Sequence, residues 1–173
     1  MSVGTMVTIV LLMIVLVLGI FFIQKIFGAG TDAIDTIDNE VQSQIQKLFA
    51  EEGRKVAVYP TSREITLKKG DDPAGFAFSV RNTDVEESSF SYNTYSTDVS
   101  TCGSTFSEAH ANNMLLAGTG SFNLGPGNSL DIPILVRFVV PESTPPCTII
   151  YQVDITKGGS SYSTIPGIAV TIK

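Results

Sequence analysis

The sequence predicts an α+β protein in which one long N-terminal helix, apolar at first and then amphipathic, precedes an antiparallel β-sandwich. Three observations support this: an uncharged apolar run at residues 6–23, a helical spacing of apolar residues that continues to residue 50, and a two-residue alternation from residue 55 onward. The predicted parts are an N-terminal helix at residues 1–52, with an apolar span at 6–23 and an amphipathic extension at 24–50, and a head domain at 53–173.

The apolar run from Met6 to Ile23 holds eighteen residues without a charge, and Thr8 is its only polar side chain. The hydrocarbon layer of a membrane takes about 20 apolar residues of helix, so the run predicts a transmembrane helix. Because the run is apolar on every side, we expect lipid or other protein to surround it. It is too long for a secretory signal peptide and no basic residue precedes it, so we expect it to be retained.

Beyond this span, apolar or small residues recur three or four positions apart, which is typical of one face of a helix. They are Phe27, Gly30, Ile34, Ile37, Val41, Ile45 and Leu48. A continuous helix to Ala50 would be about 70 Å long, with a bend favoured at Gly28 and Gly30. A plain tether is usually polar or rich in Pro and Ser, so the stripe predicts a protein partner along the helix. The alternative is that its last two or three turns pack on the chain's own head.

The head is predicted from segments of alternating polarity that Gly, Pro, Asn and Asp turns separate. Eight short strands of this kind indicate an antiparallel sandwich, and Pro133 and Pro166 indicate edges or bulges. Residues 104–117 fit neither pattern, apart from a short helix expected at Ser107–Leu116. The predicted strands are Lys55–Tyr59, Arg63–Lys68, Gly75–Asn82, Ser88–Tyr95, Ser121–Leu124, Leu130–Val140, Thr148–Thr156 and Ile168–Ile172.

Charge and cysteine content narrow the function. The chain has 173 residues, with 11 basic and 17 acidic side chains and a net charge of −6 at pH 7. No basic cluster offsets that sign, which argues against nucleic-acid binding. Cys102 and Cys147 are the two cysteines, and beyond a membrane span they predict a disulfide in an oxidising, extracytoplasmic compartment. The alternative is a pair of buried free thiols.

Enzymatic chemistry finds little support. His110 is the single histidine and has no evident orienting partner, and no hydrolase, zinc-protease or phosphate-loop motif occurs. The acidic pairs Asp71–Asp72 and Glu86–Glu87 lack the spaced ligands of a calcium loop. We therefore expect no enzyme activity, no cofactor and no metal site. Three strand aromatics are expected in the core or in cross-strand pairs, with sugar binding as the alternative: Phe90, Tyr92 and Tyr95.

One segment and the order of the whole chain carry a family resemblance. Residues 122–156, FNLGPGNSLDIPILVRFVVPESTPPCTIIYQVDIT, contain an L-x-P-G-x-S turn, a long strand and a Pro-rich corner. They resemble the later half of the immunoglobulin-like domains common on microbial surfaces. An apolar helix, an amphipathic continuation and such a head together resemble archaeal type IV pilins and the related archaellins. Bacterial type IV pilins carry Glu at the fifth mature position, where this chain has Thr5.

The resemblance implies an immunoglobulin-like head and a structural subunit of an extracellular archaeal type IV pilus-like filament. Such a subunit is inserted in the membrane before assembly, is processed by a prepilin-type peptidase, and is polymerised with copies of itself by pilus assembly machinery. The alternative function is a single-span, membrane-tethered binding module or adhesin that does not polymerise. The residues expected to pack in the filament core are Val7, Val10, Leu11, Ile14, Leu16, Leu18, Gly19, Phe22, Ile23, Phe27, Ile34, Ile37, Val41, Ile45 and Leu48.

Overall fold

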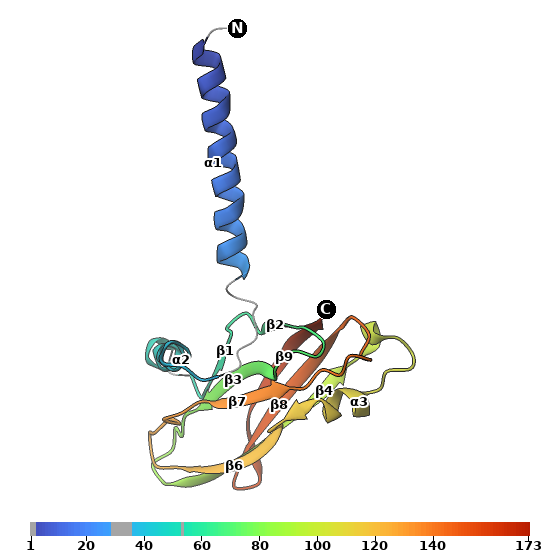
Figure 1. Cartoon of the computed structure of the whole chain (residues 1–173). Coiled ribbons are helices and arrows are strands. Elements are labelled where there is room, and N and C mark those ends of the chain that lie inside the picture. Colours follow the sequence, from blue (N-terminus) through green and yellow to red (C-terminus); the bar gives the residue numbers. More distant parts are fainter. Residues whose placement is uncertain (1–2, 29–35, 53) are drawn as a thin grey trace.

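The computed structural model describes residues 3–28, 36–52 and 54–173, without the side chains of residues 3, 21–28 and 51–52. The protein is mostly β-structure arranged in two sheets, and its helices are separate elements (Figure 1). These helices are α1 (Val3–Gly28), α2 (Asn39–Glu52), the 3₁₀ helix η1 (Ser100–Cys102) and α3 (Glu108–Asn113).

The predicted fold class is wrong in its first part, because no single long helix joins the apolar span to the amphipathic extension. α1 ends at Gly28, residues 36–38 are not helical, and α2 begins at Asn39. The Asp38 carboxylate accepts a hydrogen bond from the Val41 backbone N–H at 2.9 Å, as an N-cap side chain does. A new helix therefore starts where the apolar spacing alone predicted a continuous one.

The two sheets also differ from the predicted sandwich. The first contains, in spatial order, β1 (Val56–Tyr59), β3 (Ala74–Val80), β7 (Ile134–Phe138) and β5 (Leu115–Leu116). The second contains β2 (Glu64–Leu67), β9 (Ser160–Ile172), β8 (Cys147–Lys157), β4 (Ser88–Asp98) and β6 (Thr119–Leu124). Residues 60–63 carry the chain from one sheet to the other, and β2 then pairs with β9 in parallel. The head is therefore a mixed two-sheet structure rather than the purely antiparallel immunoglobulin-like sandwich that we predicted.

The predicted strand segments all coincide with strands, although their bounds shift. β9 begins at Ser160 rather than Ile168, and β7 is shorter than the predicted segment. The two-residue β5 was not predicted, and the expected helix at Ser107–Leu116 is confirmed only as the shorter α3. An edge or a bulge was expected at Pro166, and the structure has a bulge there, because the register of β8 and β9 shifts between Tyr151 and Val153, opposite that position.

The main core lies between the two sheets and is rich in aromatic residues. Phe76, Phe78, Phe90 and Tyr151 are fully buried there. The Tyr151 hydroxyl donates a hydrogen bond of 2.8 Å to the carbonyl oxygen of Ala111 in α3, so this buried polar group is satisfied. Phe90 and Tyr92 thus belong to the core, as one of the two interpretations of the strand aromatics predicted.

A second, smaller core lies under α2. Because strand side chains alternate between faces, Ala57 and Ala77 point away from the main core, and α2 covers them with Val41, Ile45 and Phe49. Ile37 and Leu48 are partly buried on the same cluster. This part of the predicted stripe is therefore covered by the chain's own head, as the alternative held, and a partner for it is not needed.

Candidate functional site

The largest uncovered apolar surface of the described residues is on α1. Its large side chains from Met6 to Ile20 are 49–68 % exposed, and they lie on every side of the helix. Figure 1 shows α1 projecting from the β-rich head rather than lying against it. Of the predicted filament-core residues, these are exposed: Val7, Val10, Leu11, Ile14, Leu16 and Leu18.

The polar and small positions of α1 are compatible with wholly apolar surroundings. The Thr8 hydroxyl donates a hydrogen bond of 2.6 Å to the carbonyl oxygen of Gly4, so it needs no water or external partner. A Cβ atom added at Gly19 would meet nothing within 4 Å. Gly19 therefore leaves room for another chain to approach the helix backbone closely.

Several predicted residues lie outside what the structure describes. The side chains of Phe22, Ile23 and Phe27 belong to the undescribed part of α1, and Ile34 lies among residues 29–35. Among the residues that were described, no helix has both the length and the apolar character needed to cross a membrane. The predicted transmembrane helix is therefore not confirmed.

The predicted disulfide is confirmed. Cys102 in η1 and Cys147 at the start of β8 are joined with an S–S distance of 2.03 Å and a Cα–Cα distance of 4.9 Å. Both residues are buried in the main core. The bond ties the loop after β4 to β8, and Thr101 adds two hydrogen bonds with the Thr148 backbone, of 2.7 and 2.9 Å.

The described part of the chain was predicted to lack a metal site, and its side chains bear directly on that prediction. It contains no group of three or more His, Cys, Asp and Glu side chains that could hold a metal ion. His110 has a local structural role: its Nδ1 accepts a hydrogen bond of 3.2 Å from the Ser107 backbone N–H in a capping box that starts α3. Its ring packs 5.6 Å from the Phe106 ring.

The clear pKa shifts have structural causes. Burial raises the pKa of Tyr151, and it also raises the pKa of Tyr92, which is less deeply buried. The hydrogen bond that Tyr95 donates to Asp154, at 2.8 Å, raises the pKa of that phenol. The backbone N–H of Ser100 donates to Asp98 and lowers the pKa of its carboxyl group. These groups are held in core and surface contacts and do not converge on a common pocket.

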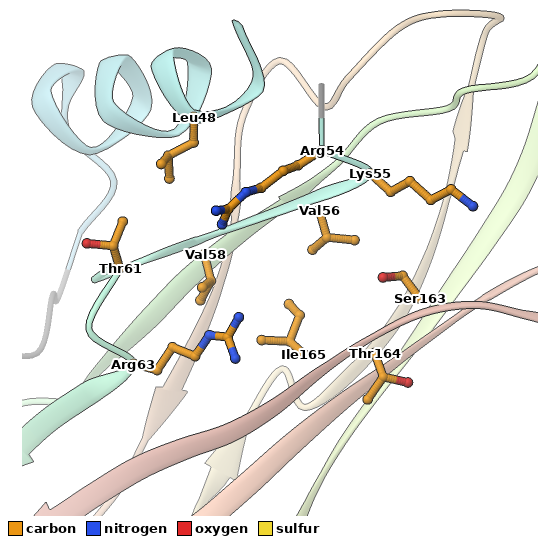
Figure 2. Close-up of a pocket in the computed structure, with 10 residues that line it drawn as sticks. All are labelled: Leu48, Arg54, Lys55, Val56, Val58, Thr61, Arg63, Ser163, Thr164 and Ile165. Carbon is orange, nitrogen blue, oxygen red and sulfur yellow. The ribbon is translucent and has the colours of Figure 1, made fainter. Parts of the chain in front are cut away.

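A basic pocket opens between β1, the following loop and β9, with a volume of about 260 Å³ (Figure 2). Apolar side chains of Val56, Val58 and Ile165 line it, and the described lining also includes three basic residues and no acidic one. The basic residues are Arg54, Lys55 and Arg63. Arg63 is half-buried, and its guanidinium donates a hydrogen bond of 3.1 Å to the carbonyl oxygen of Pro166.

Comparison with known proteins does not assign the chain to a family: no family model matches it, and no curated protein matches its sequence. The sequence interpretation identified α1 and the disulfide but missed the basic pocket. The available signal was the pair Arg54–Lys55 directly before a strand. Arg63, the third basic residue of the pocket, comes close to this pair only because the chain crosses from one sheet to the other between β1 and β2.

Proposed function

We propose that the protein is a structural rather than catalytic subunit of an extracellular filament of the archaeal type IV pilus kind, and that copies join through α1. The observation that carries this proposal is the apolar surface of α1, which is exposed on all sides. The Cys102–Cys147 disulfide supports an oxidising compartment for the head. The partners in this proposal are other copies of the chain, with assembly machinery and a prepilin-type peptidase implied by the resemblance.

The driving force for burying α1 is large. Thirteen large hydrophobic side chains between Met6 and Ile20 are about half exposed or more. Full burial of one such side chain contributes about 1.5–3 kcal/mol relative to full exposure. Burying the exposed fraction of all of them would therefore contribute on the order of 15 kcal/mol per subunit. The association cost of about 4–15 kcal/mol has to be subtracted from that gain.

The chemistry of α1 favours copies of itself as the occupant. Each helix offers its neighbours the same apolar side chains, Thr8 is satisfied internally, and Gly19 permits close approach. Because every helix carries a head at one end, repeated contacts between neighbouring copies are heterologous, and a heterologous contact that does not close generates a helical filament. The competing function is a binding module whose α1 rests in lipid while the head stays single.

The test compares an aspartate inside α1 with the same change on the head. Leu16 is 62 % exposed and Ile132 is 68 % exposed, so neither substitution disturbs a buried core. We expect the full-length protein and Ile132→Asp to form filaments in negative-stain electron microscopy of surface material. Leu16→Asp should form none while its head unfolds at an unchanged temperature.

Normal filaments from Leu16→Asp would refute the role of α1. A full-length wild-type protein found only as single copies in membranes would instead support the tethered binding module. Mass spectrometry of the threads seen by microscopy identifies whether this chain is their subunit, which excludes filaments built from another protein.

A further inference from the structure

We propose that the loop between β3 and β4 of one copy docks in the basic pocket of a second copy and so joins neighbouring heads. This loop, residues 83–87 with the sequence TDVEE, is called the acidic finger below. The inference concerns the heads alone and does not depend on α1 being the filament core.

The acidic finger presents an apolar residue at its tip. Val85 is 89 % exposed, more than any other large hydrophobic side chain described. It lies between Asp84 on one side and Glu86 and Glu87 on the other, and all three acidic residues are exposed. An isolated exposed valine needs no explanation, but this one is held out by a loop that is fixed in place.

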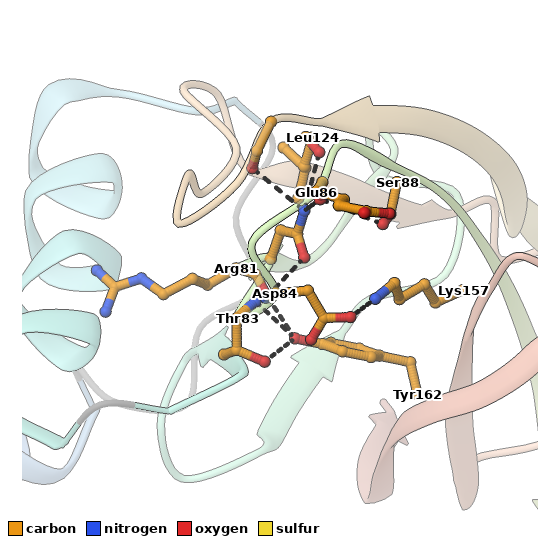
Figure 3. A network of polar contacts seen from close by, with 10 residues as sticks. Arg81, Thr83, Asp84, Glu86, Ser88, Leu124, Lys157 and Tyr162 are labelled. Atoms are coloured by element: carbon orange, nitrogen blue, oxygen red, sulfur yellow. Dashed lines mark hydrogen bonds and ion pairs between the residues drawn. The ribbon is translucent and has the colours of Figure 1, made fainter.

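Polar contacts hold the base of the finger in place (Figure 3). One of the residues that make these contacts is a buried asparagine. Asn82 is fully buried, and its amide donates to the carbonyl oxygens of Glu86, Leu124 and Gly125 at 2.8, 3.0 and 3.2 Å. Its side-chain oxygen accepts from the backbone N–H of Asp84 at 3.1 Å. The side-chain amide thus closes the loop on itself and ties it to the loop after β6.

A second set of contacts holds the finger from the side of β8 and β9. The Tyr162 hydroxyl donates 2.6 Å to the Arg81 carbonyl oxygen and accepts from the Thr83 backbone N–H at 3.3 Å. Lys157 forms an ion pair with Asp84. Among the described residues, no lysine forms an ion pair with the carboxylates of Glu86 and Glu87. A loop fixed in this way loses little conformational entropy when it binds.

The basic pocket complements the finger in both charge and polarity. Its apolar lining of Val56, Val58 and Ile165 matches an aliphatic tip, and none of the described residues that line it is acidic. Figure 2 shows the side chains of Arg54 and Arg63 extending toward Val58, whereas Lys55 points to the other side. The Arg63 guanidinium can pair with a carboxylate through two parallel hydrogen bonds, which suits Glu86 or Glu87 beside the inserted valine.

The occupant has to come from another copy. In its own chain the finger is tied by Asn82 to the loop after β6, and Val85 remains 89 % exposed instead of lining the pocket. The chain as a whole is acidic, so the pocket is a local exception that attracts an acidic segment of the same protein. Finger and pocket are different patches, so the contact is heterologous and can repeat from head to head.

Cysteine cross-linking tests this contact in the full-length protein. The described cysteines are paired in the disulfide, and both Val85 in the finger and Thr61 at the pocket are exposed. One preparation carries Val85→Cys and the other Thr61→Cys, and the two are mixed, co-assembled and mildly oxidised. The control replaces the first with Ile132→Cys, an exposed apolar position outside both patches.

We expect a heterodimer band on non-reducing gels for the Val85→Cys and Thr61→Cys mixture, at least fivefold stronger than for the Ile132→Cys control. Adding Glu86→Arg and Glu87→Arg to the finger should reduce that band at least fivefold. A band no stronger than the control, or one that the arginines leave unchanged, would overturn the docking. Electron microscopy of the same samples separates the two proposals: filaments without the cross-link refute only the head contact, and the cross-link without filaments refutes only the α1 assembly.

Discussion

Removing the disulfide is the perturbation whose effect on the head can be worked out most directly. Cys102 and Cys147 are 45 residues apart in sequence. On the chain-entropy model, opening a loop of that length adds conformational freedom to the unfolded state and lowers the free energy of unfolding by about 4 kcal/mol. For a head of about 120 residues, the entropy of unfolding is on the order of 0.25 kcal/mol/K, so the melting temperature should fall by about 15 °C.

The assay is thermal unfolding of the full-length protein in detergent, followed by circular dichroism, with and without a thiol reductant. The Cys102→Ala and Cys147→Ala double variant should melt about 15 °C lower and no longer respond to reductant. Reduced wild-type protein has both sulfur atoms but no bond, so it separates the bond from the lost packing of two buried side chains. Equal melting temperatures for oxidised and reduced wild type would refute the reasoning, because the loop-closure effect would then be absent.

Two further predictions concern the β-structure. Gly75→Ala should lower the free energy of unfolding by about 3 kcal/mol in denaturant titrations, because its Cβ would lie 1.8 Å from the Val136 carbonyl oxygen and push β3 from β7. The control Gly19→Ala, which has open space around it, should leave the unfolding of the head unchanged. An equally mild effect of both substitutions would contradict this prediction. Burial raises the pKa of Tyr151, so above about pH 10 the unfolded state loses a proton that the folded state keeps, and stability should fall by about 1.4 kcal/mol per pH unit from this group. Tyr151→Phe should remove this dependence of stability on alkaline pH. It should also lower the free energy of unfolding at neutral pH by about 1 kcal/mol, because the Ala111 carbonyl loses its hydrogen-bond partner. An unchanged alkaline slope would show that Tyr151 does not titrate on unfolding.

The strands were predictable because alternation and turn residues act locally. Segments such as Phe76–Val80 keep their alternating pattern whatever they pack against, and the structure places a strand at each predicted position. Which strands pair is a different matter, because it depends on residues far apart in sequence. The parallel pairing of β2 with β9 follows from the crossing at residues 60–63, and no local pattern distinguishes that crossing from an ordinary turn.

The helices show the opposite limit. The spacing from Ile37 to Leu48 correctly predicted a helix with one apolar face, yet it could not show that the face packs on Ala57 and Ala77. The break between α1 and α2 had a local signal in Asp38, an N-cap residue type, which the continuous apolar spacing outweighed in the prediction. The basic pocket had only a weak signal, because its residues come from both sheets.

The two helices divide the apolar residues of the N-terminal region in a way that bears on assembly. α2 has apolar residues on one face, and the head covers that face, with Val41 and Ile45 at 4 % and 2 % exposure. α1 has them on every face, and a single sheet could cover only one face of such a helix, so packing against the head would still leave most of α1 uncovered. Only surroundings that enclose a helix, a bundle of other helices or a lipid phase, can cover it. A bundle of copies would cover α1, and the proposed contact between the acidic finger and the basic pocket would separately require the same partner, a second copy of this chain.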